Sequence, residues 1–318
     1  MDLTKLNENL KNYSPAFSDA LLEKSIKELN EDPETRNESC LNLYKKFYQK
    51  HPNLCVKYND QLSDPVFLLR FLRVGKFKVD KSLLKLVEWI KTIDGEAWPE
   101  LAIRIKEKER LIQFVNKSKL FMLKNAAKTG QEEIENLAEH ELPWLVISNT
   151  DPEIRDSYGK DNVYDYFLDV AATSIISVDY MYKCDEAAQI CGLYNANMLD
   201  DDNKSSSNKS KKSKSENSLL FFIKNFSTFK KLITIWTSTL NVRSLGSLKL
   251  NFKPSLLAKT MEKLSSPFLS DKIKSRNRKL GENWMDEDIF IKENLPRCYG
   301  GGLEDSKGLE WIEKYFEM

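Results

Sequence analysis

The stretch that decides the fold runs from residue 63 to residue 77 and reads SDPVFLLRFLRVGKF. Apolar side chains cover most of its circumference, and Pro65 near its start is typical of the first turn of a helix. The pattern therefore predicts a largely buried helix. Arg70 and Arg73 interrupt it about 60° apart around the axis, so they form one narrow basic edge. These arginines either meet carboxylates inside the protein or face an anionic ligand.

Length and composition indicate an ordinary globular protein. The chain has 318 residues, of which 41% are hydrophobic and 31% charged, enough for one large domain or two modest ones. Its five cysteines are widely spaced and follow no metal or disulfide pattern, which favours free thiols. We see neither a signal-peptide pattern at the N-terminus nor an apolar run of about 20 residues. We therefore expect a cytoplasmic protein that visits membranes only peripherally.

The first part of the chain is predicted to be a helical bundle. Apolar residues recur at helical spacing in 18–32, 33–51 and 79–93, and a longer charged helix is expected over roughly 98–125. Short connections between the segments favour packing of neighbouring helices against one another. We place an N-terminal helical domain at 1–125.

The second part alternates predicted strands with helices. Short apolar runs at 142–149, 188–199 and 244–252 are typical of buried strands, and residues 162–182 read as a helix between two of them. This order predicts a mixed α/β domain with a largely parallel sheet over 126–318. Residues 200–217 contain no apolar side chain and are interpreted as a low-complexity insertion.

The net charge of +1 conceals a basic segment. Residues 224–279 carry 13 Lys or Arg and two acids, a local net charge of +11, which leaves −10 for the remainder. Such a segment is typical of contact with an anionic surface, either nucleic acid or acidic lipid headgroups, although a solvated helix face is the simpler alternative. Aromatic residues do not alternate with this charge as in a nucleic-acid reader, so we expect no nucleic-acid partner.

Three segments in order resemble one family. DPVFLLRFLRVGKFKVDKSLLKLVEWIK (64–91), SSPFLSDKIKSR (265–276) and LPRCYGGGLED (295–305) are similar to motifs of the CRAL-TRIO lipid-binding proteins. The similarity is greatest to the branch of the alpha-tocopherol transfer protein and cellular retinaldehyde-binding protein. The resemblance implies an N-terminal bundle on an α/β domain whose hydrophobic cavity is closed by a gate helix.

The same resemblance implies which residues line the cavity and its gate. The gate would begin at Phe252 and run to about residue 263, where apolar residues at helical spacing are flanked by lysines. An ordinary core helix is the alternative that the residues alone leave open. The candidates for the lining and gate are Phe167, Ile175, Ile176, Tyr194, Phe252, Leu256, Leu257 and Met261; apolar residues such as the lining candidates more often belong to a plain core than contact a ligand.

A phosphoinositide site near the gate is also implied by the resemblance. Lys272 and Arg276 match two basic positions of the family and, four residues apart, share one helix face suited to phosphate oxygens. Arg243 matches a third position if two residues are inserted after it. A further basic position of the family is Gly75 here, for which Arg73 or Lys76 is the candidate substitute.

Two more positions depart from the family pattern. Asn241 stands in place of a lysine, and Lys249 stands where a histidine is typical.

Motifs of common enzymes are missing from the sequence. There are two histidines, His51 and His140, far apart, and we find no nucleophile elbow, P-loop, zinc-protease or dinucleotide motif. We expect no enzyme, no metal and no cofactor. The predicted function is binding of a small hydrophobic ligand or lipid and its transfer between membranes. The alternative is a phosphoinositide-sensing adaptor or signalling module without transfer activity.

Overall fold

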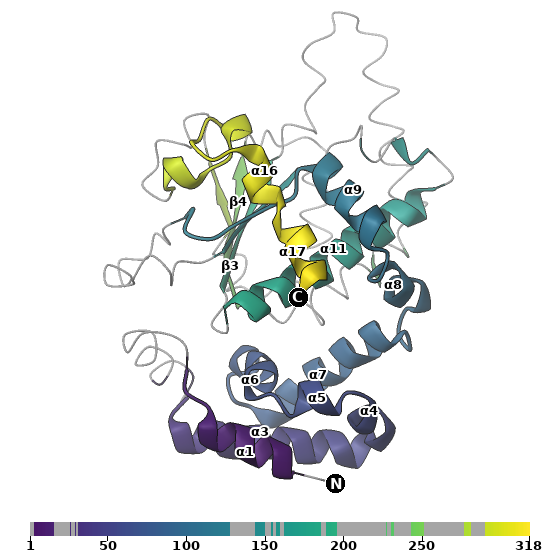
Figure 1. Ribbon diagram of the computed structural model, residues 1–318, viewed down its shortest axis with the longest axis vertical. Coiled ribbons are helices and arrows are strands. Elements are labelled where there is room, and N and C mark those ends of the chain that lie inside the picture. The colour runs from purple at the N-terminus through teal and green to yellow at the C-terminus, as the bar shows by residue number, and fades with distance from the viewer. Residues whose placement is uncertain are drawn as a thin grey trace, which may run out of the picture.

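The computed structural model combines a helical bundle at one end with a small sheet and its covering helices at the other (Figure 1). The residues that the structure describes are 3–15, 26, 29, 31–127, 144–149, 154, 157–159, 162–185, 189–195, 227, 230–231, 243–250, 277–280 and 290–318. The predicted helix at 18–32 lies mostly outside these residues, and the predicted gate helix from Phe252 to about residue 263 and the insertion at 200–217 lie wholly outside them.

The described part of the N-terminal half is helical, as the sequence predicted. Its helices are α1 (Thr4–Asn12), α3 (Pro33–Lys50), α4 (Pro52–Lys57), α5 (Asn59–Leu62), α6 (Pro65–Val74), α7 (Val79–Asp94), α8 (Pro99–Arg104) and α9 (Lys108–Ser118). The cap of α6 is Asp64, whose carboxylate accepts a hydrogen bond from the Val66 amide at 2.9 Å. Helices α3, α6 and α7 pack on one another, and the leucines between them are fully buried.

The single helix expected over 98–125 is wrong. The chain instead forms α8 and α9, separated by a tight turn in which the amide of Glu107 bonds the carbonyl of Arg104. Helix α9 ends at Lys119, whose φ of 50° is left-handed, and the following Phe121–Leu123 form strand β1. The three β1 side chains are buried, so pairing in the sheet overrides the helical pattern of the sequence.

A five-stranded sheet forms the centre of the second part. Its order is β1-β2-β3-β4-β5, with β2 at Trp144–Asn149, β3 at Gln189–Asn195, β4 at Arg243–Leu250 and β5 at Asn277–Lys279. Strand β1 is antiparallel to β2, and the other described pairs are parallel. The three strands predicted from sequence and their largely parallel pairing are confirmed; β1 and β5 were not predicted.

Helix α11 (Val163–Cys184) is the crossover between β2 and β3, as predicted for residues 162–182. In Figure 1 it crosses the molecule beside α9 and α17 (Trp311–Glu317), both of which contact it. Small residues such as Ala171 and Ala172 let its neighbours approach closely, and both are fully buried. The chain is therefore a mixed α/β protein, mostly helical, with a small mixed sheet.

The C-terminal segment closes over the first strand. The amide of Ile291 bonds the carbonyl of Ala126 at 3.0 Å, which extends the pairing beyond β1. Helix α16 (Asp305–Leu309) then lies on β1, where a side chain at Gly308 would come within 2.7 Å of Phe121 Cδ1. The sheet thus begins at Phe121, before the domain boundary that the sequence predicted at 125/126; that boundary stays a prediction.

Candidate functional site

Helix α11 carries three of the predicted cavity residues. Phe167, Ile175 and Ile176 are buried, with exposed fractions of 8%, 1% and 0%. The helix is apolar nearly all round, as expected for a segment enclosed by other elements. Burial agrees with either a cavity lining or a plain core, so the cavity role of these residues stays a prediction.

Helical geometry separates the three candidates. Ile176 follows Phe167 by about 2.5 turns, so the two side chains leave α11 on opposite sides. Ile176 shares a face with Asp165 and Asp169, which contact α8 and α9. Phe167 and Ile175 are about 80° apart. A cavity on the side of α11 opposite this polar face can therefore contain Phe167, with Ile175 at its edge, but not Ile176.

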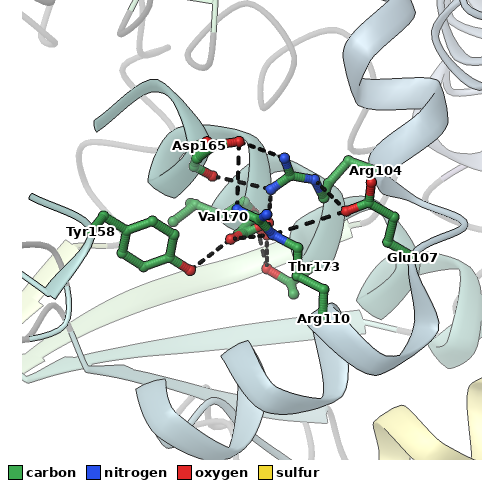
Figure 2. Close-up of polar contacts among 8 residues, drawn as sticks. Arg104, Glu107, Arg110, Tyr158, Asp165, Val170 and Thr173 are labelled. Atoms are coloured by element: carbon green, nitrogen blue, oxygen red, sulfur yellow. Dashed lines mark hydrogen bonds and ion pairs between the residues drawn. The ribbon is translucent and has the colours of Figure 1, made fainter. Parts of the chain in front are cut away.

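A cluster of charged side chains fixes the first half of α11. Figure 2 shows Asp165 of α11 directed towards Arg104 and Arg110. Arg104 forms ion pairs with Asp169 and, at 2.5 Å, with Asp165. Arg110 Nε donates to Asp169 Oδ1 at 3.0 Å. Because Asp169 is fully buried, these arginines supply the charge that burial requires.

Further polar groups complete this cluster. Tyr158 donates its hydroxyl hydrogen to Asp169 Oδ2 at 2.6 Å, and Glu107 Oε2 forms an ion pair with Arg104 Nε at 2.9 Å. Burial raises the pKa of Tyr158, and the bond to Asp169 raises it further. Burial alone would lower the pKa of Arg104, but its bonds to Asp165 and Asp169 outweigh this, so the pKa is raised. Two arginines thus offset most of the charge of three carboxylates, and the cluster holds α11 against α8 and α9.

Arg70 occupies an aromatic enclosure between the bundle and α11. Its guanidinium carbon lies 4.2 Å from the centre of the Trp89 ring and 5.5 Å from that of Tyr182. Two rings of its own helix, Phe67 and Phe71, lie at 4.5 and 4.8 Å. Stacking of this kind is favourable for a planar guanidinium.

Asp179 of α11 supplies the opposite charge. Its Oδ1 accepts from Arg70 Nη1 at 2.9 Å, while the Arg70 side chain is 3% exposed. Burial lowers the pKa of Arg70, and Asp179 opposes that effect; a guanidinium nevertheless keeps its proton. Among the residues that the structure describes, Nε and Nη2 of Arg70 have no hydrogen-bond partner, so the aromatic rings and the bond to Asp179 hold this cation there.

Arg73, the expected headgroup residue of this helix, meets a carboxylate instead. Its Nε donates to both oxygens of Glu31 at 3.0 Å, and its Nη2 donates to Glu31 Oε1 at 2.6 Å. Tyr13 accepts a further bond at 3.3 Å. Arg73 is 6% exposed and Glu31 is fully buried. Of the two interpretations of the arginines, internal pairing with carboxylates is the one observed; a headgroup role for Arg73 stays a prediction.

The remaining predicted residues are described in part or not at all. Arg243 opens β4, where its backbone pairs in register with Gln189 of β3. Tyr194 lies in β3, in register with Lys249. The other predicted residues lie outside the described part of the chain: Lys272, Arg276, Phe252, Leu256, Leu257 and Met261. The phosphoinositide site and the gate therefore stay predictions.

Two further observations concern the described part of the chain. It contains no group of three or more His, Cys, Asp or Glu side chains placed to hold a metal ion. Of the helices that could be examined there, none has the length and apolar character needed to cross a membrane.

Sequence reasoning missed the carboxylates that position the arginines. Asp179 and Asp169 lie inside an apolar helix, where a buried acid calls for a cationic partner. The two acids are visible in the apolar segment 162–182, but the sequence does not show which cation pairs with each of them.

Comparisons with known proteins find a likeness among solved structures. No family model matches the chain, and no curated protein matches it. Among solved structures, the crystal structure of Sfh5, a Sec14-family (CRAL-TRIO) protein, is similar with a TM-score of 0.39 and 10% sequence identity. The match covers 99% of this chain and 98% of that one.

Proposed function

We propose that this chain is a non-catalytic carrier of the CRAL-TRIO type. It binds a small hydrophobic ligand or lipid in an internal cavity and transfers it between membranes, from the cytoplasm and by transient peripheral contact. The observation that carries the proposal is that the opening motif (64–91) and the closing motif (295–305) contact the same α/β layer. The opening motif reaches α11 through Arg70, and the closing motif lies beside β1, where the Tyr299 ring contacts that of Phe121.

The opening motif joins the bundle to the α/β layer. Residues 64–91 form α6 and α7; Arg70 of α6 contacts Asp179 and Tyr182 of α11 and stacks on Trp89 of α7. A bundle fixed in this way supports the layer that would enclose a ligand. This is the arrangement that the family resemblance implies for the two parts of the chain.

The closing motif is a compact turn. The amide of Leu303 donates to the carbonyl of Leu295 at 2.9 Å, and the amide of Gly301 donates to the carbonyl of Pro296. A side chain at Gly301 would lie 2.1 Å from the Leu295 oxygen, so the turn requires a residue without Cβ. The glycines of this motif thus have a packing role, and nothing in them needs a bound phosphate.

The physical basis of carriage is the hydrophobic effect. Each Å² of apolar ligand surface taken from water stabilises the complex by roughly 25 cal/mol. An anionic membrane would favour release only if headgroup contacts are stronger in the open state than in the closed one. The lysine- and arginine-rich residues 224–279 are the proposed source of that difference.

The experiment that tests carriage combines ligand identification with transfer. The full chain is incubated with a cell lipid extract and its native mass spectrum is recorded, followed by transfer of the bound compound from donor to acceptor vesicles. One bound mass with accelerated transfer is the expected result. Vesicle binding without transfer would favour the adaptor instead, and a chain that stays empty after repeated exposure would overturn the proposal.

The phosphoinositide site needs its own test. We expect Lys272→Ala with Arg276→Ala to weaken binding to vesicles containing phosphatidylinositol bisphosphate while cargo binding stays nearly intact. Lys106→Ala with Lys108→Ala removes the same charge from exposed positions and serves as the control. Equal vesicle binding by the parent and the first variant would rule out this headgroup site.

A further inference from the structure

We propose that a lysine-rich face of the helical bundle, built from α3 and α7, docks on an anionic lipid bilayer. It comprises Lys46 and Lys50 of α3, Lys81 and Lys85 of α7, Lys78 at the start of α7, and Leu84 among them. We call this set the α3/α7 lysine patch. It deepens the proposed function by naming a surface for membrane contact outside residues 224–279, and to that extent rests on it.

The first observation is the exposure of Leu84. Its exposed fraction is 68%, whereas the opposite face of α7 is fully engaged in the core through Leu83, Leu86 and Ile90. Lys81 and Lys85, one turn apart, stand beside Leu84 on the outer face. Helix α7 is therefore amphipathic: its apolar face packs on the core, and its solvent face presents one apolar side chain, Leu84, between cations.

The second observation is that lysines of another helix lie on the far side of Leu84. Lys46 Nζ contacts Asp80 Oδ1 at 2.6 Å, and Asp80 precedes Leu84 by one turn on the same edge of α7. The bond to Lys46 lowers the pKa of Asp80, and the charge of Lys50 adds to this effect. Cations from α3 and α7 thus surround Leu84.

The third observation concerns the ion pairing of the patch lysines in and before α7. Lys78, Lys81 and Lys85 form no ion pair with any residue that the structure describes. Burial lowers the pKa of Lys85, and the neighbouring charge of Lys81 lowers it further. Two acids accompany the patch, Asp80 and Glu88, so its five lysines leave a net charge of about +3.

The chemistry favours a bilayer over other anionic partners. Lysine stems can lie along the interface while their ammonium groups meet lipid phosphates and carboxylates, and Leu84 can enter the acyl boundary between them. A nucleic acid would gain nothing from the exposed leucine, and the patch offers no exposed aromatic ring for base stacking. We therefore commit to an anionic lipid surface as the occupant.

Vesicle binding of matched variants tests the proposal. Lys81→Gln with Lys85→Gln is compared with the parent for binding to phosphatidylcholine vesicles containing phosphatidylserine. We expect roughly twenty-fold weaker binding at low salt, since each lysine near a membrane contributes about fivefold. Leu84→Ser should weaken binding by about threefold to tenfold and should do so at high salt as well. The control is Lys106→Gln with Lys108→Gln, which should bind like the parent.

A footprint on the unmodified chain gives a second readout. Acetylation of Lys81 and Lys85 should fall when anionic vesicles are added and stay unchanged with pure phosphatidylcholine, while Lys106 and Lys108 react equally throughout. Unchanged labelling together with parent-like binding of the patch variants would overturn the proposal. Protection by RNA or an acidic protein and not by vesicles would overturn it too.

The two proposals fail in distinguishable ways. Patch-dependent vesicle binding by a chain that transfers no lipid supports the docking surface and contradicts the carrier. Lipid transfer by a chain whose patch variants bind vesicles like the parent supports the carrier and contradicts the docking surface.

Discussion

Arg70 Nη1 and Asp179 Oδ1 lie 2.9 Å apart although their residues are 109 positions apart in the chain. The bond ties α6, the first helix of the opening motif, to α11, the crossover helix of the sheet. The two partners differ in exposure, because the Arg70 side chain is 3% exposed and that of Asp179 23%. Loss of Asp179 therefore leaves a buried cation, whereas loss of Arg70 leaves a partly exposed carboxylate.

We predict that Asp179→Ala destabilises the protein more than Arg70→Met. The first change leaves a fully buried cation without its partner, at a cost of about 3–5 kcal/mol in free energy of unfolding. The second leaves a carboxylate that water and Lys183 can reach, while methionine fills the aromatic enclosure, so about 1–2 kcal/mol is expected. Guanidinium denaturation followed by circular dichroism measures both. An equal or larger loss for Arg70→Met would contradict the asymmetry.

A surface pair provides the control for this comparison. Lys5 and Asp60 also bridge distant segments, but their side chains are 53% and 86% exposed. Lys5→Met should leave the unfolding midpoint almost unchanged, since exposed pairs are hydrated and screened.

Arg73 and Glu31 should behave as one energetic unit. Removing either charge strands the other in a buried site, so Arg73→Met and Glu31→Gln should each cost about 3–5 kcal/mol in free energy of unfolding. The double variant should lose less than the sum, with a coupling of about 1–3 kcal/mol. A double-mutant cycle by denaturation measures the coupling. Strict additivity would show that the pair is not formed in solution.

The sequence predicted what depends on local pattern. The apolar runs and start signals of α6, α7 and α11 are local, and those helices were predicted nearly to their ends. Strand β1 was missed because three residues, Phe121–Leu123, are too few to show a period of two. Their conformation is set by β2, more than 20 residues away in the sequence.

The candidate site was less predictable because it depends on long-range partners. The basic edge of Arg70 and Arg73 was visible, and so were its two possible roles. The choice between carboxylates and a ligand depends on Asp179 and Glu31, whose positions follow only from tertiary packing. Lys272 and Arg276 were named from the family resemblance, and both lie outside the described residues.

The turn of the closing motif should tolerate no side chain at Gly301. Its Cβ would lie 2.1 Å from a backbone oxygen of Leu295, which cannot move without opening the turn. We predict that Gly301→Ala costs about 3 kcal/mol or more in free energy of unfolding. Gly159→Ala is the control, because that site has a φ of +75° but open space around it, and should cost only about 1–2 kcal/mol. Equal losses in thermal or chemical unfolding would contradict the close approach.

Cys40 should make the protein lose stability in alkali. Burial raises the pKa of its thiol from 9.0 to about 12, and the side chain is fully buried. Below pH 9 the thiol is protonated in both states; above it the unfolded chain loses a proton that the folded chain keeps, which stabilises the unfolded state. The free energy of unfolding should therefore fall as pH rises from about 9 towards 12.

Cys40→Ala isolates this contribution from other alkaline groups. Between about pH 8 and about pH 10 the parent should lose about 1.4 kcal/mol more than the variant, as measured by urea unfolding at each pH. Leu43→Ala, in the same buried face of α3, lowers stability without removing a titrating group and should keep the slope of the parent. If Cys40→Ala and Leu43→Ala show the same pH dependence, the thiol ionises as readily in the folded protein as in the unfolded chain, and Cys40 is not enclosed as the structure has it.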